Sequence, residues 1–268
     1  MKEVRPAAVA GAFYPGEPGV LKHDIQAMLA AVKATADATP PKALIVPHAG
    51  YIYSGPIAAS AYARLIPLRQ QVTRVVLLGP VHRVPVRGLA LPGVDSFETP
   101  LGIIPLDQQA MARVARLPQV VESFPVHAWE HSLEVQLPFL QMVLDDFSLV
   151  PLAVGDATPE EVAEVLEQLW GGPETLIVIS SDLSHYLPYD VAKRVDSETA
   201  QAILALAAPV SHEQACGGTP VNGLLVAARH HHLKPHLLDL RNSGDTSGDR
   251  SRVVGYGAFA FEEPGHVH

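Results

Sequence analysis

Four short, uninterrupted apolar runs restrict the fold of this chain more than any other feature of its sequence. They are Ala43–Val46, Arg74–Leu78, Leu149–Val154 and Thr175–Ile179. None shows the polar–apolar alternation of a half-exposed strand, so each is expected to form a strand buried on both faces of a sheet. A later run, Val253–Phe261, does alternate and predicts a further strand.

Helical patterns lie between these runs. Val20–Val32 is amphipathic and rich in alanine, and Ser54–Pro56 is expected to begin a helix that continues to about Leu65. Pro159–Trp170 carries the fullest set of signals, with Thr158 as its N-cap and acidic residues in its first turn. Strands that alternate with helices predict βαβ units, and therefore an α/β fold with a largely parallel sheet.

Length and composition limit the class of protein. The chain has 268 residues without an internal repeat or a linker, so residues 1–268 are expected to form one domain. A net charge of -9 and the lack of a basic run argue against a nucleic-acid-binding surface. Neither a membrane-spanning apolar segment nor a signal peptide is expected. A single cysteine suits a reducing compartment, so we expect a cytoplasmic location.

Histidines follow three of the buried runs just after the point where each strand is expected to end. The first run leads into His48, the second into His82, and the last into Asp182 and His185. Ligands of open α/β sheets bind outside the carboxyl ends of the strands, so these side chains should converge if the strands are parallel neighbours. Imidazole offers metal ligation or proton transfer near neutral pH. Asp182 either orients His185 across a helical turn or merely caps that turn.

Cys216 lies just before a helix that is expected to start with Thr219 as its N-cap and Pro220 in its first turn. A thiol near a helix N-terminus has a lowered pKa and more thiolate character, and thiolate is the form that binds metals. The alternative is that Cys216 is a small buried apolar side chain, which is how free cysteine usually behaves. The sequence leaves both interpretations open.

The stretch His127–His131 reads H-x-x-E-H, the inverted motif of one class of zinc proteases. On a single helix, His127 and His131 would lie one turn apart and share a metal ion, with Glu130 as general base. No third ligand follows from the motif. The other interpretation is that Glu130, His131 and Glu134 form a polar face at the start of a helix, where His131 lines a pocket.

Longer motifs give a resemblance over nearly the whole chain. They include AGAFYPG, VPHAGYIYSG, LLGPVHR, EHSLEVQLPFL, ISSDLSHY, CGGTPVNGLL and NSGDTSGDRSRVVGYGAFAF. In order and spacing they resemble the Memo family, also called AmmeMemoRadiSam system protein B in bacteria and archaea, over about residues 5–262. The resemblance implies a single three-layer α/β/α domain with a largely parallel or mixed central sheet, similar to that of LigB-like class III extradiol dioxygenases.

The resemblance also implies a metal site. Extradiol dioxygenases hold non-haem Fe(II) with two histidines and a glutamate, and they open catechol rings with O₂. The matching pocket of Memo proteins is described as holding iron or copper, and its ligands correspond here to His48, His82 and Cys216. His185 matches the histidine that handles protons, with Asp182 beside it. A thiolate in place of the glutamate softens the ligand set and favours Cu(I), Zn or thiolate-bound iron.

Two classes of function are compatible with this resemblance. The first is an O₂-dependent ring-cleaving or redox enzyme for a small aromatic substrate, in which Tyr51, Tyr53 and Tyr186 line the pocket and His185 is the general acid/base. The second is a non-enzymatic copper- or iron-binding module that works with AMMECR1-like and radical-SAM proteins.

Overall fold

The four continuous apolar runs form the centre of one sheet, as expected. The computed structural model describes residues 3–33, 39–207 and 209–264. The four central strands are neighbours, all parallel, in the order β2 (Pro41–Val46), β9 (Thr175–Ser180), β3 (Arg74–Pro80) and β8 (Ser148–Val154). Every residue of β2 and β9 is buried, because helices cover both faces of the sheet here.

Antiparallel strands extend the sheet on both sides, so the sheet is mixed. On one side β12 (Val253–Glu262) runs antiparallel to β2, and both β11 (Lys234–Asn242) and β10 (His185–Leu187) pair with β12. On the other side β4 (Leu89–Leu91) runs antiparallel to β8 and pairs with β7 (Val120–Glu122). A small separate sheet contains β1 (Val4–Arg5), β5 (Ser96–Thr99) and β6 (Gly102–Pro105).

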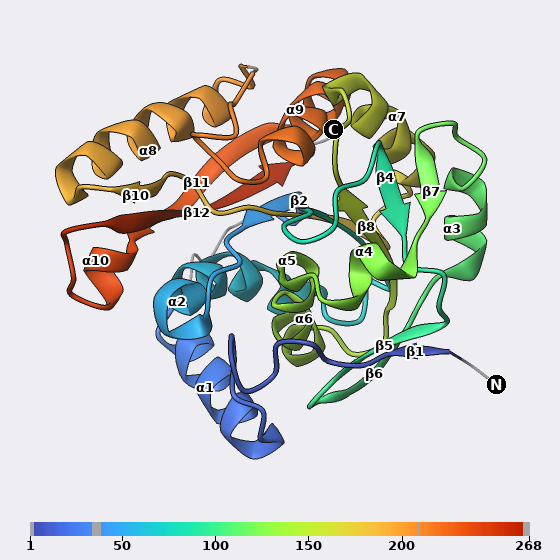
Figure 1. The fold of residues 1–268 in the computed structure, drawn as a ribbon, viewed down its shortest axis with the longest axis horizontal. Coiled ribbons are helices and arrows are strands. Elements are labelled where there is room, and N and C mark those ends of the chain that lie inside the picture. The colour runs from blue at the N-terminus through green and yellow to red at the C-terminus, as the bar shows by residue number, and fades with distance from the viewer. Residues whose placement is uncertain (1–2, 34–38, 208, 265–268) are drawn as a thin grey trace.

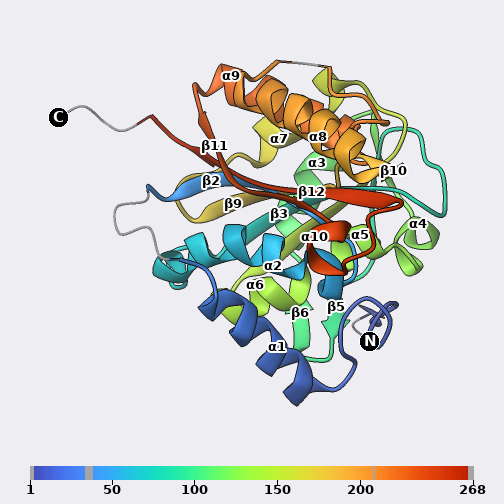
Figure 2. The same cartoon turned by 90° about the vertical axis from the view of Figure 1, so that its left-hand side faces the viewer.

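Helices pack on both faces of the large sheet and complete the α/β/α layers (Figures 1 and 2). One face carries α1 (Pro18–Ala30), α2 (Tyr51–Tyr62) and α6 (Leu137–Val143), and the other carries α7 (Pro159–Leu169), α8 (Tyr189–Leu204) and α9 (Gly218–His230). The shorter helices are η1 (Ala63–Leu68), α3 (Gln108–Val114), α4 (Phe124–Ala128), α5 (His131–Glu134) and α10 (Ser243–Thr246). None of the helices in the described ranges is both long and apolar enough to cross a membrane.

Helix starts were predicted with mixed success. The prediction for α7 is confirmed, since the side chain of Thr158 caps its N-terminus and Pro159 opens its first turn. The prediction for α2 is wrong, because the helix begins at Tyr51 and not at Ser54. The backbone N–H of Tyr51 donates to the carbonyl of Phe13, 2.8 Å away, so a distant segment satisfies the group that a capping side chain would otherwise serve.

A buried ion pair fastens the N-terminal segment against α5. The side chains of Arg5 and Glu134 are 1% and 0% exposed, and their closest N–O distance is 2.7 Å. The Glu134 carboxylate also accepts hydrogen bonds from the backbone N–H groups of Ala8 and Val9 and from the hydroxyl of Tyr14. This network fixes the segment that carries Phe13 beside α2 and α5.

Replacing Glu134 tests this network. In Glu134→Gln the Arg5 guanidinium stays buried without a counter-ion, so the free energy of unfolding should fall by about 3–5 kcal/mol in urea denaturation. The control is Asp145→Asn, which removes the partner of Arg69 in an exposed pair and should cost less than ~1 kcal/mol. Equal losses in the two variants would show that the buried pair is not a principal tether.

Candidate functional site

Three neighbouring parallel strands deliver polar side chains to one end of the sheet. His48 follows β2, His82 follows β3, and Asp182 follows β9, which lies between the other two strands. His185 opens β10 shortly after Asp182. The convergence expected from the sequence is present, since a cavity of about 790 Å³ is lined by all four of these residues.

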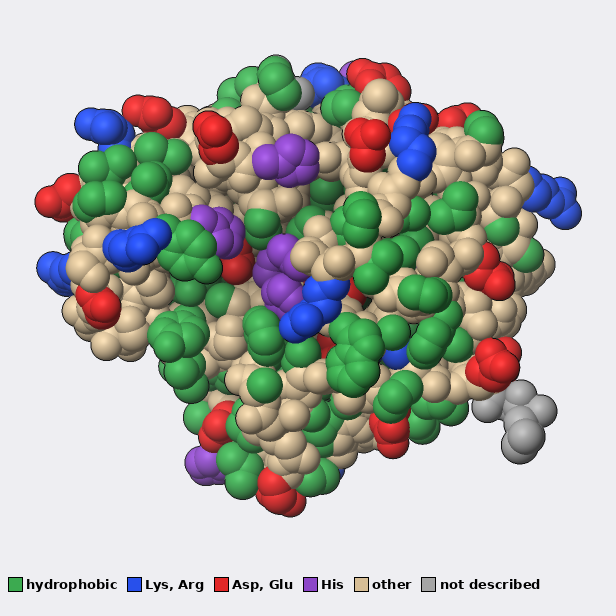
Figure 3. Space-filling model, in the orientation of Figure 1, with side chains coloured by type: hydrophobic (Ala, Val, Ile, Leu, Met, Phe, Trp, Pro, Cys, Tyr) green, Lys and Arg blue, Asp and Glu red, His purple; other side chains and the backbone are tan. Residues whose placement is uncertain are grey.

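A fourth histidine joins this group from α5 and completes a cluster that can hold a metal ion. One ligand atom from each of His48, His82 and His131 lies within 4.8 Å of the other two. The ring centroids of His82 and His131 are 4.5 Å apart, and those of His48 and His82 are 5.2 Å apart. Figure 3 shows histidine side chains gathered around a hollow near the centre of this face. The sequence analysis gave His131 as a pocket-lining residue, and as a metal ligand only in the zinc-protease interpretation of the H-x-x-E-H stretch.

Glu130 orients two of the three rings. Its carboxylate accepts from the backbone N–H of His82 (2.6 Å), lies 2.8 Å from Nδ1 of the same ring, and lies 3.4 Å from Nδ1 of His131. Burial acts to raise the pKa of Glu130, but the hydrogen bonds and charge of His82 and the bond from Ser132 outweigh it and lower that pKa to about 2. The ionised carboxylate bonds Nδ1 of His82 and lies beside Nδ1 of His131, which leaves the two Nε2 atoms available as ligands.

A hydrogen-bond network sets the tautomer of His48. Nδ1 of His48 is 2.9 Å from the hydroxyl of Ser180, and that hydroxyl donates its only hydrogen to the carbonyl of Ser132. The Ser180 oxygen can therefore only accept from Nδ1, so Nδ1 carries the hydrogen and Nε2 presents a lone pair. Burial, reinforced by His131 and His82, holds the pKa of His48 well below its usual range. The ring is therefore neutral and is able to act as a metal ligand.

Cys216 lies against this ring. Its Sγ is 3.2 Å from Nε2 of His48 and 3.7 Å from the carbonyl oxygen of Asp182. Burial, with a smaller contribution from the charge of Asp182, raises the pKa of the Cys216 thiol to about 12. Of the two interpretations that the sequence left open, the structure favours the buried thiol, because desolvation of the thiolate outweighs the nearby helix N-terminus. A metal ion in contact with Sγ would reverse this balance.

The helix after Cys216 starts earlier than predicted. Gly217 is the N-cap of α9, and the hydroxyl of Thr219 instead hydrogen-bonds His212. A side chain at Gly217 would meet Ser181 at 2.7 Å, so glycine allows the start of α9 to approach the end of β9. This close approach places Cys216 next to His48.

Asp182 supports His48 and not His185. Its Oδ1 accepts from the backbone N–H of His48 (2.7 Å), and its Oδ2 is 4.0 Å from Nε2 of that ring. Burial raises the pKa of Asp182 to about 7, against hydrogen bonding from His48. Nδ1 of His185 bonds the carbonyl of Leu183 (2.9 Å), because the chain between Asp182 and His185 is not helical. The predicted Asp182–His185 pairing is therefore wrong.

Aromatic side chains form part of the cavity wall, and the three predicted tyrosines differ in their positions. Tyr53 and Tyr186 line the cavity. Tyr51 is buried beside it, where its hydroxyl donates to the carbonyl of Val135 and does not reach the cavity. Further lining residues that the sequence analysis missed are Phe13, Ser243, Asp249, Arg252 and Tyr256.

The H-x-x-E-H stretch does not form a protease site. Helix α4 ends at Ala128 and α5 begins at His131, so His127 and His131 are not one turn apart on a single helix. Nε2 of His127 donates to the carbonyl of Ala90 in the core, which removes this nitrogen from ligation. Glu130 instead pairs with His82.

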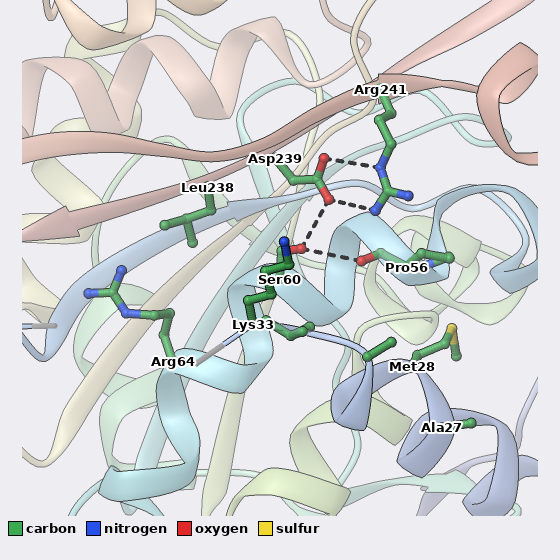
Figure 4. Close-up of a pocket in the computed structure, with 11 residues that line it drawn as sticks. Ala27, Met28, Lys33, Pro56, Ser60, Arg64, Leu238, Asp239 and Arg241 are labelled. Atoms are coloured by element: carbon green, nitrogen blue, oxygen red, sulfur yellow. Dashed lines mark hydrogen bonds and ion pairs between the residues drawn. The ribbon is translucent and has the colours of Figure 1, made fainter. Parts of the chain in front are cut away.

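A cavity elsewhere in the molecule lacks comparable chemistry. It measures about 570 Å³ and lies between α1, α2 and β11 (Figure 4). Figure 4 shows that the carboxylate of Asp239 is bonded to Arg241 and to Ser60. Arg64, at the same cavity, pairs with Glu262, which the figure does not draw. These polar groups are partnered within the protein, so the histidine-lined cavity remains the candidate site.

Comparisons with known proteins agree with this fold and these motifs. A family model described as "Memo-like protein" matches residues 5–260. A MEMO1 family protein of Metallosphaera sedula is 35% identical over 97% of this chain and 99% of its own length, and one of Aquifex aeolicus is 36% identical over 96% and 99%. A solved structure of uncharacterized protein JW3007 from Escherichia coli K12 has a TM-score of 0.50 at 16% identity, over 81% of this chain and 98% of its own. This likeness concerns the fold alone.

Removing the charge of Glu130 tests its role in orienting the rings. Glu130→Gln should weaken Co(II) binding, followed by the visible spectrum, by about 10–100-fold, because His82 and His131 lose the partner that fixes their Nδ1 atoms. Glu160→Gln, at an exposed position in the first turn of α7, is the matched control and should bind as the parent protein does. Unchanged affinity in Glu130→Gln would mean that Glu130 does not orient the ligand rings.

Proposed function

This chain belongs to the Memo family, and we propose that it is a metal-dependent oxidoreductase that cleaves the ring of a small aromatic substrate with O₂. The observation that carries the proposal is the cluster of His48, His82 and His131 at the wall of an aromatic-lined cavity. Both atoms of O₂ would enter the opened ring, so the reaction needs no external reductant. A concave cavity with few converging polar groups suits a small organic ligand.

The ligand chemistry favours Fe(II) or copper, with Zn as a further candidate. Neutral imidazoles suit Fe, Cu and Zn, whereas Mg²⁺ and Ca²⁺ prefer oxygen ligands. If His48, His82 and His131 held the ion, its remaining coordination positions would be available to substrate and O₂. When bound, the ion supplies Lewis-acid and redox chemistry to substrate oxygen and O₂.

His185 is the proposed general base. A carbonyl oxygen only accepts, so the bond to Leu183 places the hydrogen of the neutral ring on Nδ1 and leaves the lone pair on Nε2. Burial lowers the pKa of His185, which keeps the ring neutral at physiological pH. Nε2 can then accept a proton from a substrate hydroxyl in the cavity and return it to the product. Asp182 holds the backbone of His48 in place.

Two residues are candidates for the third metal ligand beside His48 and His82, namely His131 and Cys216. The resemblance implies Cys216, whose Sγ lies 3.2 Å from Nε2 of His48 but which is not among the residues that line the main cavity. Cys216 instead lines a smaller cavity that His82 and His185 also reach. We propose His131 as the third ligand of a divalent ion, and Cys216 as the additional donor that a soft ion such as Cu(I) would recruit.

The copper-recruiting thiol supports a second candidate function, a non-enzymatic redox or metal-handling module. AMMECR1-like and radical-SAM proteins would be its partners. In this case Cys216→Ser should weaken Cu(I) binding at least ~10-fold in competition with a chelator, and should leave Co(II) binding nearly unchanged. Cu(I) affinity that does not respond to Cys216→Ser would exclude the copper module.

The enzyme proposal is tested by oxygen uptake. Fe(II)-loaded protein should consume O₂ with some member of a catechol panel, and His185→Ala should lower the rate about 10²–10⁴-fold while retaining the iron. The matched control is His236→Ala, at an exposed histidine on β11, which should keep the parent rate. If the iron-loaded parent consumes no O₂ with any member of the panel, the ring-cleavage proposal fails.

A further inference from the structure

The mouth of the histidine-lined cavity holds an exposed aromatic side chain beside an arginine. Tyr186 is 63% exposed, and its backbone has a φ of 58°, in the left-handed region that non-glycine residues rarely occupy. The guanidinium carbon of Arg252 lies 5.4 Å from the centroid of the Tyr186 ring. Exposed aromatics and unusual backbone conformations cluster at ligand-binding sites, and both line this cavity.

Arg252 has no counter-ion among the residues that the structure describes. No ion pair or hydrogen bond in those ranges involves its side chain, and it is the one Lys or Arg among the cavity-lining residues there. The exposed carboxylate at the same cavity, Asp249, already accepts from the backbone N–H and the hydroxyl of Ser251. The neighbouring Arg250 instead lies over the ring of Tyr189, outside the cavity. The Arg252 guanidinium is therefore free to pair with a ligand.

The walls of the cavity carry three kinds of group: the histidine cluster, aromatic side chains and the guanidinium of Arg252. The histidine cluster supplies a place for a metal ion and for the hydroxyl oxygens of a ring, and Phe13 and Tyr53 add aromatic surface. A bound divalent cation would add positive charge that the neutral imidazoles do not compensate and that the single Glu130 carboxylate offsets only in part, so an anionic ligand would be favoured at the cluster. Arg252 adds a fork of donors that matches a carboxylate.

We propose that Arg252, held by Tyr186, selects aromatic substrates that carry a carboxylate remote from the ring hydroxyls. This inference rests on the proposed function, because the histidine cluster is taken to bind the hydroxyl end. It names the substrate class as carboxylated catechols and separates them from neutral ones. Tyr186 acts as a positioning residue, since its ring face attracts the guanidinium and limits where it can lie.

The test compares two probes that differ in the carboxylate. Under argon, calorimetry with the iron-loaded protein should give a dissociation constant ~10-fold lower for 3,4-dihydroxyphenylacetate than for 4-methylcatechol, a difference of about 1.4 kcal/mol. In Arg252→Gln the ratio should fall below ~2, and Arg252→Lys should retain part of it because the charge stays without the fork. The control is Arg250→Gln, which should keep the parent ratio.

The outcomes distinguish a failure of the carboxylate selection from a failure of the proposed metal-centred function. If both probes bind the parent equally, or if Arg252→Gln weakens both by the same factor, the carboxylate selection is wrong while the metal-centred function stands. If neither probe binds the iron-loaded parent, the proposed function fails and the selection fails with it. Raised salt should reduce the preference for the acid, because the Arg252 side chain is exposed to solvent.

Discussion

One buried carboxylate, that of Glu130, organises the site on which the rest of this account depends. Its two oxygens bind the backbone and ring of His82, cap α5 through Ser132, and lie near the ring of His131. It thereby connects the loop after β3 to a helix that lies far along the chain. The buried pair of Arg5 and Glu134 adds a second tether at the same helix, since the Arg5 side chain also donates to the carbonyl of Glu130. Carboxylates that are hydrogen-bonded this fully give ligand rings a defined orientation before a metal ion binds.

The parts of the structure that depend on local pattern followed from the sequence. The continuous apolar runs predicted strands that are covered on both faces. Ligands bind at the carboxyl ends of parallel strands, and this rule predicted correctly that His48, His82 and His185 line one cavity. The antiparallel partners at the edges of the sheet were not foreseen in this detail. Their pairing is set by contacts between segments distant in sequence, for which β4 and β8 are one example.

The features that the sequence could not provide all depend on long-range contacts or on burial. The start of α2 depends on the carbonyl of Phe13, and the entry of His131 into the cluster depends on Glu130 reaching His82. The thiol of Cys216 has a raised pKa because the fold removes it from water, an effect that its position near a helix start does not reveal. Arg252 was missed because only the folded chain brings it beside Tyr186.

The central claim is that His48 and His82, with His131, hold a metal ion, and an anomalous difference map from a crystal of the iron-loaded protein tests it most directly. The account predicts one strong peak in the cavity, about 2 Å from a nitrogen of each of these three rings. A peak bonded to Cys216 in place of His131 would contradict the three-histidine set. No peak at this end of the sheet would contradict the metal centre itself.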